Sequence, residues 1–263
     1  MRAPIGAPYA PAVATVLVTG GTGTLGRELV PQLRRAGHEV RVLSRRPGAG
    51  THVGDLTTGQ GLGDACEGAD VVVHAASDTH RMGRADERQA ANLLASAGGA
   101  GHLVYLSIVG VDRIPYGYYR RKLACERLVA EGPVPSTVLR ATQFHQLLAG
   151  AMRLLDRLPV APLPLAFRFQ PIAAGEVAAR LAGLAGADPA GRVDDLGGPE
   201  VLTLGELARV WRSARGRPVR VVDVPVPGEV ARGFRQGRNT CPDHAAGEET
   251  WERFAASYPV AGT

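Results

Sequence analysis

The chain has 263 residues, of which 45% are hydrophobic and 21% are charged, and this is enough to form one large core or a core with a smaller lobe. Its 34 glycines and 19 prolines are spread among apolar segments, which excludes a wholly disordered chain. The net charge of +5 permits a nucleic-acid partner, but the arginines are scattered and form no basic stripe with aromatic residues, so we expect no nucleic-acid binding.

The beginning of the chain carries no signal for membrane insertion. Residues 1–12 predict a flexible leader, because they lack the continuous apolar stretch of a signal peptide. No apolar run further along approaches the ~18 residues that a membrane helix needs. We therefore expect a cytoplasmic protein without a membrane partner.

Strands and helices alternate up to residue 140. Short apolar, β-branched runs predict strands at residues 13–19, 39–44, 52–53, 71–74, 102–107 and 136–140. Apolar residues at helical spacing predict helices at residues 27–36, 62–66, 84–97 and 118–130. Because helix-sized connections imply parallel strand pairing, this part predicts a doubly wound parallel α/β sheet of the Rossmann type.

The alternation ends after residue 140. Helices are predicted at residues 144–158, 174–184 and 203–212, the last with a capping box formed by Thr203 and Glu206. The remaining segments predict a proline-rich connection, a short strand and a polar loop, at residues 159–164, 219–222 and 236–249.

This change of pattern predicts two structural parts. Residues 13–143, together with roughly residues 169–190, are expected to form a dinucleotide-binding domain. Roughly residues 144–168, together with 191–263, are expected to form a small substrate-binding lobe over the C-terminal ends of the strands.

The cysteines predict neither a disulfide framework nor a metal site. Cys66, Cys125 and Cys241 form no C-x-x-C pair. Asp243 and His244 lie close to Cys241 in the sequence, but their spacing is poor for metal ligands, and we predict no metal.

A glycine-rich turn follows the first predicted strand. The sequence Gly21-Thr-Gly23-Thr-Leu-Gly26 fits G-x-G-x-x-G and opens a predicted helix, which is the context that a dinucleotide site requires. Glycine lets the backbone approach a pyrophosphate, and the N–H groups at the helix start bind that anion. The alternative is a tight turn without a ligand. The contacts are expected from Gly20, Thr22, Gly23, Thr24, Leu25 and Gly26.

The end of the second strand discriminates between the two nicotinamide cofactors. Sites for NAD(H) carry a carboxylate there, which binds the ribose 2′-hydroxyl. This chain has Ser44, Arg45 and Arg46 instead, which can pair with the 2′-phosphate of NADP(H). We therefore expect NADP(H), with NAD(H) as the weaker ligand. Two solvated surface arginines are the alternative.

The only lysine of the chain is Lys122. It lies four residues after Tyr118 on a predicted helix, which places both side chains on one face. A nearby ammonium group lowers the pKa of a phenol and suits it to exchange a proton with a carbonyl or alcohol oxygen. The alternative is a surface lysine beside a tyrosine that packs in the core.

Several segments match motifs that occur together in one protein family. The turn Thr19-Gly-Gly-Thr-Gly-Thr-Leu-Gly26 matches T-G-x-x-G-x-x-G, and Tyr118 with Lys122 matches Y-x-x-x-K. Further matches are Gly54-Asp-Leu56, His74-Ala-Ala-Ser77, Val104-Tyr-Leu-Ser107 and Leu139-Arg-Ala-Thr-Gln-Phe-His145. Over about residues 13–200 the chain thus resembles the extended and atypical short-chain dehydrogenase/reductases, and the last motif is similar to their NmrA-like branch.

The resemblance implies cofactor contacts beyond the glycine turn. Asp55 and Leu56 would contact the adenine. The adenine ribose and the nicotinamide half would be lined by Ala75, Ala76, Ser77, Ser107 and Lys122.

The resemblance also implies an NADPH-dependent oxidoreductase that transfers hydride to a carbonyl or conjugated small molecule. Tyr118 would be the general acid, Lys122 would hold the ribose hydroxyls and lower the Tyr118 pKa, and Ser107 would be an auxiliary donor. Active members usually carry a Ser or Thr just beyond Ser107, where this chain has Ile108 and Val109. An NmrA-like NADP(H)-sensing regulator without catalytic activity is therefore the alternative, and an isomerase or dehydratase would use the same residues.

The substrate contacts are expected after the sixth predicted strand. Gln143, Phe144 and His145 lie there, although His145 could equally be a structural histidine. We expect a small-molecule substrate and a monomer or homodimer.

Overall fold

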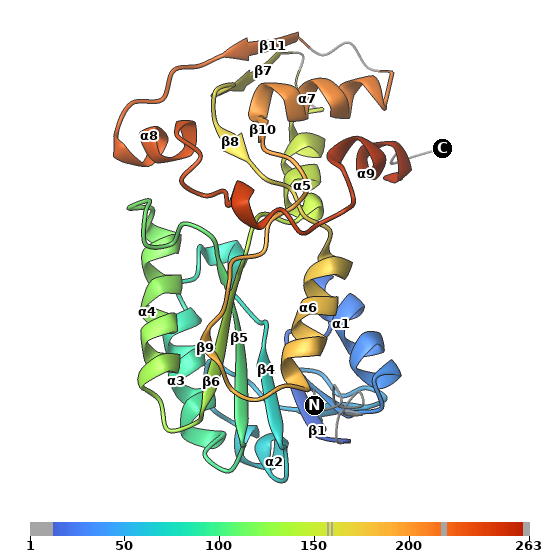
Figure 1. Ribbon diagram of the computed structural model, residues 1–263, viewed down its shortest axis with the longest axis vertical. Coiled ribbons are helices and arrows are strands. Elements are labelled where there is room, and N and C mark those ends of the chain that lie inside the picture. The colour runs from blue at the N-terminus through green and yellow to red at the C-terminus, as the bar shows by residue number, and fades with distance from the viewer. Residues whose placement is uncertain (1–12, 157, 159, 217–219, 260–263) are drawn as a thin grey trace, which may run out of the picture.

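The computed structural model describes residues 13–156, 158, 160–216 and 220–259, so the expected leader at residues 1–12 lies outside the described residues. A seven-stranded parallel sheet forms the centre of the molecule (Figure 1), in the order β3-β2-β1-β4-β5-β6-β9. This order confirms the doubly wound Rossmann-type sheet. The strands are β1 (Thr15–Thr19), β2 (Glu39–Ser44), β3 (Thr51–Val53), β4 (Val71–His74), β5 (His102–Ile108), β6 (Ser136–Ala141) and β9 (Gly191–Arg192).

Helices cover both faces of the sheet (Figure 1). One face carries α1 (Thr24–Arg35) and α6 (Ala174–Ala185), and the other carries α2 (Leu62–Cys66), α3 (Asp86–Ser96) and α4 (Gly117–Glu131). Because side chains alternate along a strand, β1 serves both layers: Val16 and Val18 join the core on the α1 side, whereas Leu17 joins the core on the α3 side. All three side chains are fully buried, and burial of each contributes about 1.5–3 kcal/mol.

A smaller lobe lies over one end of the sheet (Figure 1). Its core contains Trp211 and Trp251, whose rings stack with centroids 5.8 Å apart. As predicted, Thr203 accepts a hydrogen bond from the Glu206 backbone N–H and completes a capping box. The elements are α5 (His145–Leu155), β7 (Val160–Leu163), β8 (Arg168–Phe169), β10 (Leu202–Thr203), α7 (Leu204–Ser213), β11 (Arg220–Asp223), α8 (Glu229–Arg235) and α9 (Trp251–Ser257), with 3₁₀ turns η1 (Thr79–Arg81) and η2 (Pro242–His244).

The structure corrects the sequence-based assignment at three places. The proline-rich segment forms strand β7, in which Ala161 and Leu163 face the lobe core while Pro162 is exposed. Proline is tolerated because β7 belongs to a two-stranded sheet and pairs only with β11. The segment that begins at residue 191, which the sequence assigns to the smaller lobe, starts with β9 and completes the central sheet against β6. The predicted polar loop 236–249 contains η2.

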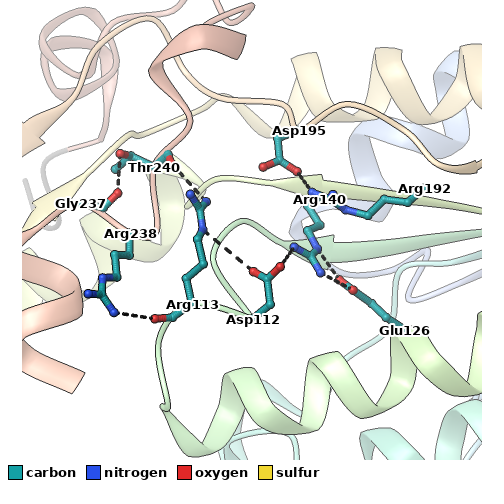
Figure 2. A network of polar contacts seen from close by, with 9 residues as sticks. All are labelled: Asp112, Arg113, Glu126, Arg140, Arg192, Asp195, Gly237, Arg238 and Thr240. Carbon is teal, nitrogen blue, oxygen red and sulfur yellow. Dashed lines mark hydrogen bonds and ion pairs between the residues drawn. The ribbon is translucent and has the colours of Figure 1, made fainter. Parts of the chain in front are cut away.

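The smaller lobe contacts the C-terminal ends of the strands. A Cβ atom on Gly110, just after β5, would meet the backbone of residues 238–239. Arg113 donates a hydrogen bond to the carbonyl oxygen of Thr240 at 3.4 Å (Figure 2). These contacts fix the lobe at the edge where the glycine turn and the end of β5 meet. In the described part of the chain, no helix combines the length and apolar character needed to cross a membrane.

An ion-pair network centred on the buried Arg140 stabilises the same region (Figure 2). Arg140 on β6 pairs with Glu126 on α4 at 2.7 Å and with Asp112, after β5, at 2.9 Å. Burial alone would raise the pKa of Asp112, but the hydrogen bond and the charge of Arg140 lower it. The network holds the loop after β5 against the sheet.

Candidate functional site

The glycine turn between β1 and α1 is shaped for close backbone approach. Gly20 has φ +72°, and a Cβ atom there would lie 2.9 Å from the backbone of Ala76. A Cβ atom on Gly26 would overlap the Gly20 carbonyl oxygen. Gly23 donates its backbone N–H to that oxygen at 2.9 Å and forms the N-cap of α1. Side chains are thus excluded at Gly20 and Gly26, and Gly23 leaves the backbone at the start of α1 uncovered.

The first turn of α1 offers donors for an anion. The first helical hydrogen bond runs from the Arg27 N–H to the Gly23 carbonyl, so the N–H groups of Thr24, Leu25 and Gly26 have no helical acceptor. No acidic residue lies in this first turn. Together with the positive end of the helix dipole, these donors fit a pyrophosphate. The Leu25 side chain is buried in the core, while Thr22 and Thr24 are exposed.

The residues proposed to select the cofactor lie at the end of β2. Arg45 and Arg46 are both exposed, and neither pairs with an acidic residue in the described ranges. The Ser44 hydroxyl donates to the Arg46 carbonyl at 2.8 Å and accepts from its N–H at 3.1 Å, so it shapes the turn that carries the two arginines. This arrangement leaves both guanidinium groups able to bind a phosphate.

The adenine-side segment after β3 is held by α3. Asp55 accepts a hydrogen bond from the Thr57 N–H at 2.7 Å, and Leu56 is buried. Asn92 on α3 donates its amide to the carbonyl oxygens of Leu56 and Thr57, at 2.8 and 3.2 Å. The position of residues 55–57 is therefore fixed by a side chain that lies 35 residues or more further along the chain.

A buried histidine ties the end of β4 to β1. The Thr19 hydroxyl lies 2.7 Å from His74 Nδ1 and accepts from the Ala76 N–H at 3.3 Å. Burial, together with the charge of Lys122, lowers the pKa of His74 to about 3, so the ring is neutral. These contacts hold Ala75 and Ala76 against the glycine turn.

Ser107 and Lys122 lie at the end of β5. The Ser107 hydroxyl is buried and finds no hydrogen-bond partner among the residues that the structure describes. Lys122 is 4% exposed, donates to the Leu106 carbonyl at 2.9 Å and lies 4.3 Å from the centroid of the Tyr105 ring. Burial lowers the pKa of Lys122, and the charge of Asp86 opposes that effect. An unpaired hydroxyl and a fixed amine at this edge fit a bound dinucleotide.

The pKa of Tyr118 differs from the expected value. This pKa is raised to about 12, chiefly because the phenol is buried, and the charge of Asp86 raises it further. The predicted lowering towards neutrality is therefore wrong. The Tyr118 hydroxyl lies 2.9 Å from the Ser77 hydroxyl, which donates to Asp86 at 2.6 Å.

The residues expected to contact substrate lie at the junction of the two lobes. Gln143 is buried and donates to the Asn239 carbonyl at 3.2 Å. His145 is fully buried, stacks on Phe254 and has its pKa lowered to about 4 by burial. Both side chains are enclosed by protein, and their contact with substrate stays a prediction. Phe144 is half-buried against the core and pairs by its backbone with residue 172.

Two side chains of the site were not assigned a role from the sequence. Asp86 lies in the first turn of α3, where acidic residues are common because they favour the helix dipole, so its position carries no special signal. Asn92 stands on the same helix, and a single helical asparagine predicts no contact. Only the packing of α3 against the turns after β3 and β4 brings these side chains to the site.

Comparison with known proteins places this geometry in a family. A family model described as NAD(P)H-binding matches residues 20–158. A Streptomyces griseus protein named (4-alkanoyl-5-oxo-2,5-dihydrofuran-3-yl)methyl phosphate reductase is 32% identical over 226 residues, which are 80% of this chain and 77% of that protein.

Solved structures show the same fold over nearly the whole chain. An NADPH-dependent quinone oxidoreductase from Escherichia coli, complexed with NADPH, superimposes with a TM-score of 0.77 at 17% identity and covers 91% of this chain and 98% of its own. A nucleoside-diphosphate-sugar epimerase from Staphylococcus aureus gives a TM-score of 0.76 at 17% identity, with 92% and 100% covered.

Proposed function

The chain belongs to the family whose model is described as NAD(P)H-binding. From this premise we propose that it is an enzyme of the atypical short-chain dehydrogenase/reductase type, which reduces a small carbonyl or conjugated compound with NADPH. The observation that carries the proposal is the meeting of three features at one edge of the sheet. These are the open glycine turn, the unpaired Ser107 hydroxyl and the Tyr118 phenol. The similarity to a reductase over most of the chain supports it.

The residues divide into groups that would hold the cofactor. The glycine turn and the first N–H groups of α1 bind the pyrophosphate, while Arg45 and Arg46 bind the 2′-phosphate. Lys122 has two N–H donors left after its bond to the Leu106 carbonyl, and these bind ribose hydroxyls. Ser107 donates its hydroxyl to the nicotinamide or to a substrate oxygen. When bound, the reduced cofactor supplies the hydride for the reduction.

Tyr118 supplies the proton. Its raised pKa keeps the phenol protonated, which is the form that a general acid needs. As the proton passes to the substrate oxygen, negative charge develops on the phenol oxygen. The buried ammonium group of Lys122, four residues on along α4, stabilises that charge.

The smaller lobe supplies the substrate surface. Phe167 and Phe169, from the segment around β8, pack against Phe234 of α8, with ring centroids 5.4 and 5.9 Å apart. The Phe234 ring also lies beside the ring of Tyr119, the neighbour of Tyr118, with the two ring centroids 6.1 Å apart. This apolar aromatic surface suits a substrate with an alkyl or aryl group beside its carbonyl. A conjugated carbonyl with an alkanoyl chain, such as the compound named for the Streptomyces reductase, has this character.

The proposal is tested by NADPH oxidation, followed by absorbance, against a panel of aldehydes, ketones, quinones and enones. Tyr118→Phe should lower turnover by about 100-fold or more, because the general acid is lost, and leave NADPH affinity unchanged. Tyr258→Phe, the same change in the smaller lobe, is the matched control. If Tyr118→Phe turns over at the parental rate on every active compound, the assignment of the acid is refuted.

One observation keeps the sensing regulator as a second candidate. The Tyr118 hydroxyl is engaged by Ser77, and no second serine follows Ser107, where Ile108 and Val109 stand. A regulator requires tight and redox-dependent dinucleotide binding without turnover. Calorimetry with NADPH and NADP⁺, set beside the turnover panel, separates the two functions.

A further inference from the structure

The Tyr118 hydroxyl begins a chain of two hydrogen bonds that ends on a buried carboxylate. It lies 2.9 Å from the Ser77 hydroxyl, and the Ser77 hydroxyl donates to Asp86 Oδ2 at 2.6 Å. Since the Ser77 proton points to Asp86, the Tyr118 hydroxyl is the donor in the bond to Ser77. The other carboxylate oxygen of Asp86 accepts the N–H of Asp78 at 2.7 Å.

The residues around Tyr118, Ser77 and Asp86 hold these two hydrogen bonds in place. Asp86 is only 3% exposed, so little of this residue is open to solvent. Gly83 in that turn has φ +71°, and a Cβ atom there would lie 2.8 Å from the Tyr118 ring and 3.2 Å from Asp86. Arg121 donates to the Met82 carbonyl at 2.9 Å and fixes the turn to α4. The turn thus packs closely against both Tyr118 and Asp86.

These two hydrogen bonds offer a path by which Tyr118 can regain its proton. Once Tyr118 has given its proton to substrate, it must regain one before the next turnover. Ser107, the residue expected to assist it, makes no hydrogen bond to Tyr118, whereas Ser77 does. Ser77, expected only as a ribose contact, is therefore placed to pass a proton.

We propose that Ser77 and Asp86 form a proton relay that restores the Tyr118 phenol after each reduction, an inference that rests on the proposed function. After the substrate oxygen has taken the Tyr118 proton, Ser77 gives its hydroxyl proton to the phenolate. Asp86, protonated by one proton from water, replaces the proton on Ser77 and returns to the carboxylate form. One proton is taken from water for each proton delivered to product, and all three side chains end as they began. Ser77 and Asp86 are positioning residues, and Tyr118 alone touches the substrate.

The test compares Ser77→Ala and Asp86→Asn with Glu87→Gln, which removes an exposed charge from the next position of α3. At saturating NADPH and substrate, both relay variants should lower kcat by about 10- to 100-fold, with KM and the NADPH Kd within about 2-fold. The ratio of kcat in H₂O to kcat in D₂O should rise, because return of the proton then limits turnover. A purely structural role for Asp86 would alter KM and Kd without this change in isotope effect. Glu87→Gln should behave as the parent.

A second measurement does not depend on turnover. The ¹³Cζ NMR signal of Tyr118, identified by its loss in Tyr118→Phe, should shift in Ser77→Ala and in Asp86→Asn but not in Glu87→Gln, since only the first two alter the bond at the phenol. An unmoved signal in both relay variants overturns the relay. Parental kcat in both relay variants, together with an inactive Tyr118→Phe, also overturns the relay. In that case the proposed function stands. If the parent reduces nothing on the panel, the proposed function fails, and the NMR signal alone decides whether the hydrogen-bond chain exists.

Discussion

Arg45 and Arg46 offer a quantitative test of cofactor choice. Both side chains are exposed at the end of β2, so each is free to bind a 2′-phosphate but is also screened by solvent. A charge-assisted hydrogen bond contributes about 1.5–3 kcal/mol, and exposure favours the lower value. Two such bonds give about 3 kcal/mol, or a preference for NADPH over NADH of about 100-fold. Arg45→Ala with Arg46→Ala should remove most of this preference and leave NADH affinity within about 2-fold.

Isothermal titration calorimetry at two salt concentrations measures the effect, since added salt should weaken NADPH binding more than NADH binding. The matched control is Arg34→Ala with Arg35→Ala. This exposed pair lies at the other end of α1, about 18 Å from the glycine turn by helical rise. Equal affinity of the unmodified protein for the two cofactors would refute the reasoning. Retention of the full NADPH preference by the Arg45 and Arg46 variant would refute it as well.

Further predictions concern the turn and the buried ion pairs. Gly23→Val should abolish NADPH binding in calorimetry while circular dichroism stays unchanged, because the added Cβ meets only the Gly20 carbonyl oxygen, at 3.2 Å. Arg140→Met should cost about 3–5 kcal/mol in urea unfolding, because it leaves the Glu126 carboxylate buried without its partner, and a smaller loss would show that water reaches Glu126. The lowered pKa of Asp112 stabilises the fold above the ordinary Asp pKa, so Asp112→Asn should be less stable than the parent at pH 7 by less than about 1 kcal/mol. That difference should vanish in unfolding curves as the pH falls below the folded-state pKa, and a difference independent of pH would contradict the assignment.

The central sheet and the glycine turn could be predicted because local patterns determine them. β2 and α2 begin and end at the predicted residues. β7 and α8 could not be predicted. β7 is a strand only because β11 lies beside it, and α8 has seven residues with Gly233 packed against Ile114.

The candidate site shows the same division. Some features of the site lie within short stretches of sequence and could be predicted from the sequence alone. These are the glycine turn, the Arg45 and Arg46 pair, and the spacing of Tyr118 and Lys122. The environment of Tyr118 depends on three segments, the end of β4, the start of α3 and α4, and their packing decides its pKa. Spacing along one helix predicted that Lys122 would dominate that pKa. The depth of burial and the Asp86 carboxylate come from other elements and act in the opposite direction.

The late return of the chain to the central sheet has a consequence for biosynthesis. β9 pairs with β6, but residues 142–190 lie between the two strands and must be synthesised first. During that interval the outer edge of β6 exposes unpaired backbone groups, which is the kind of surface that recruits strands from other chains. Closing so long a loop also costs conformational entropy that only the final packing recovers. A chain stopped at residue 190 should therefore aggregate during expression, whereas chains that extend past residue 196 can pair with the edge of β6.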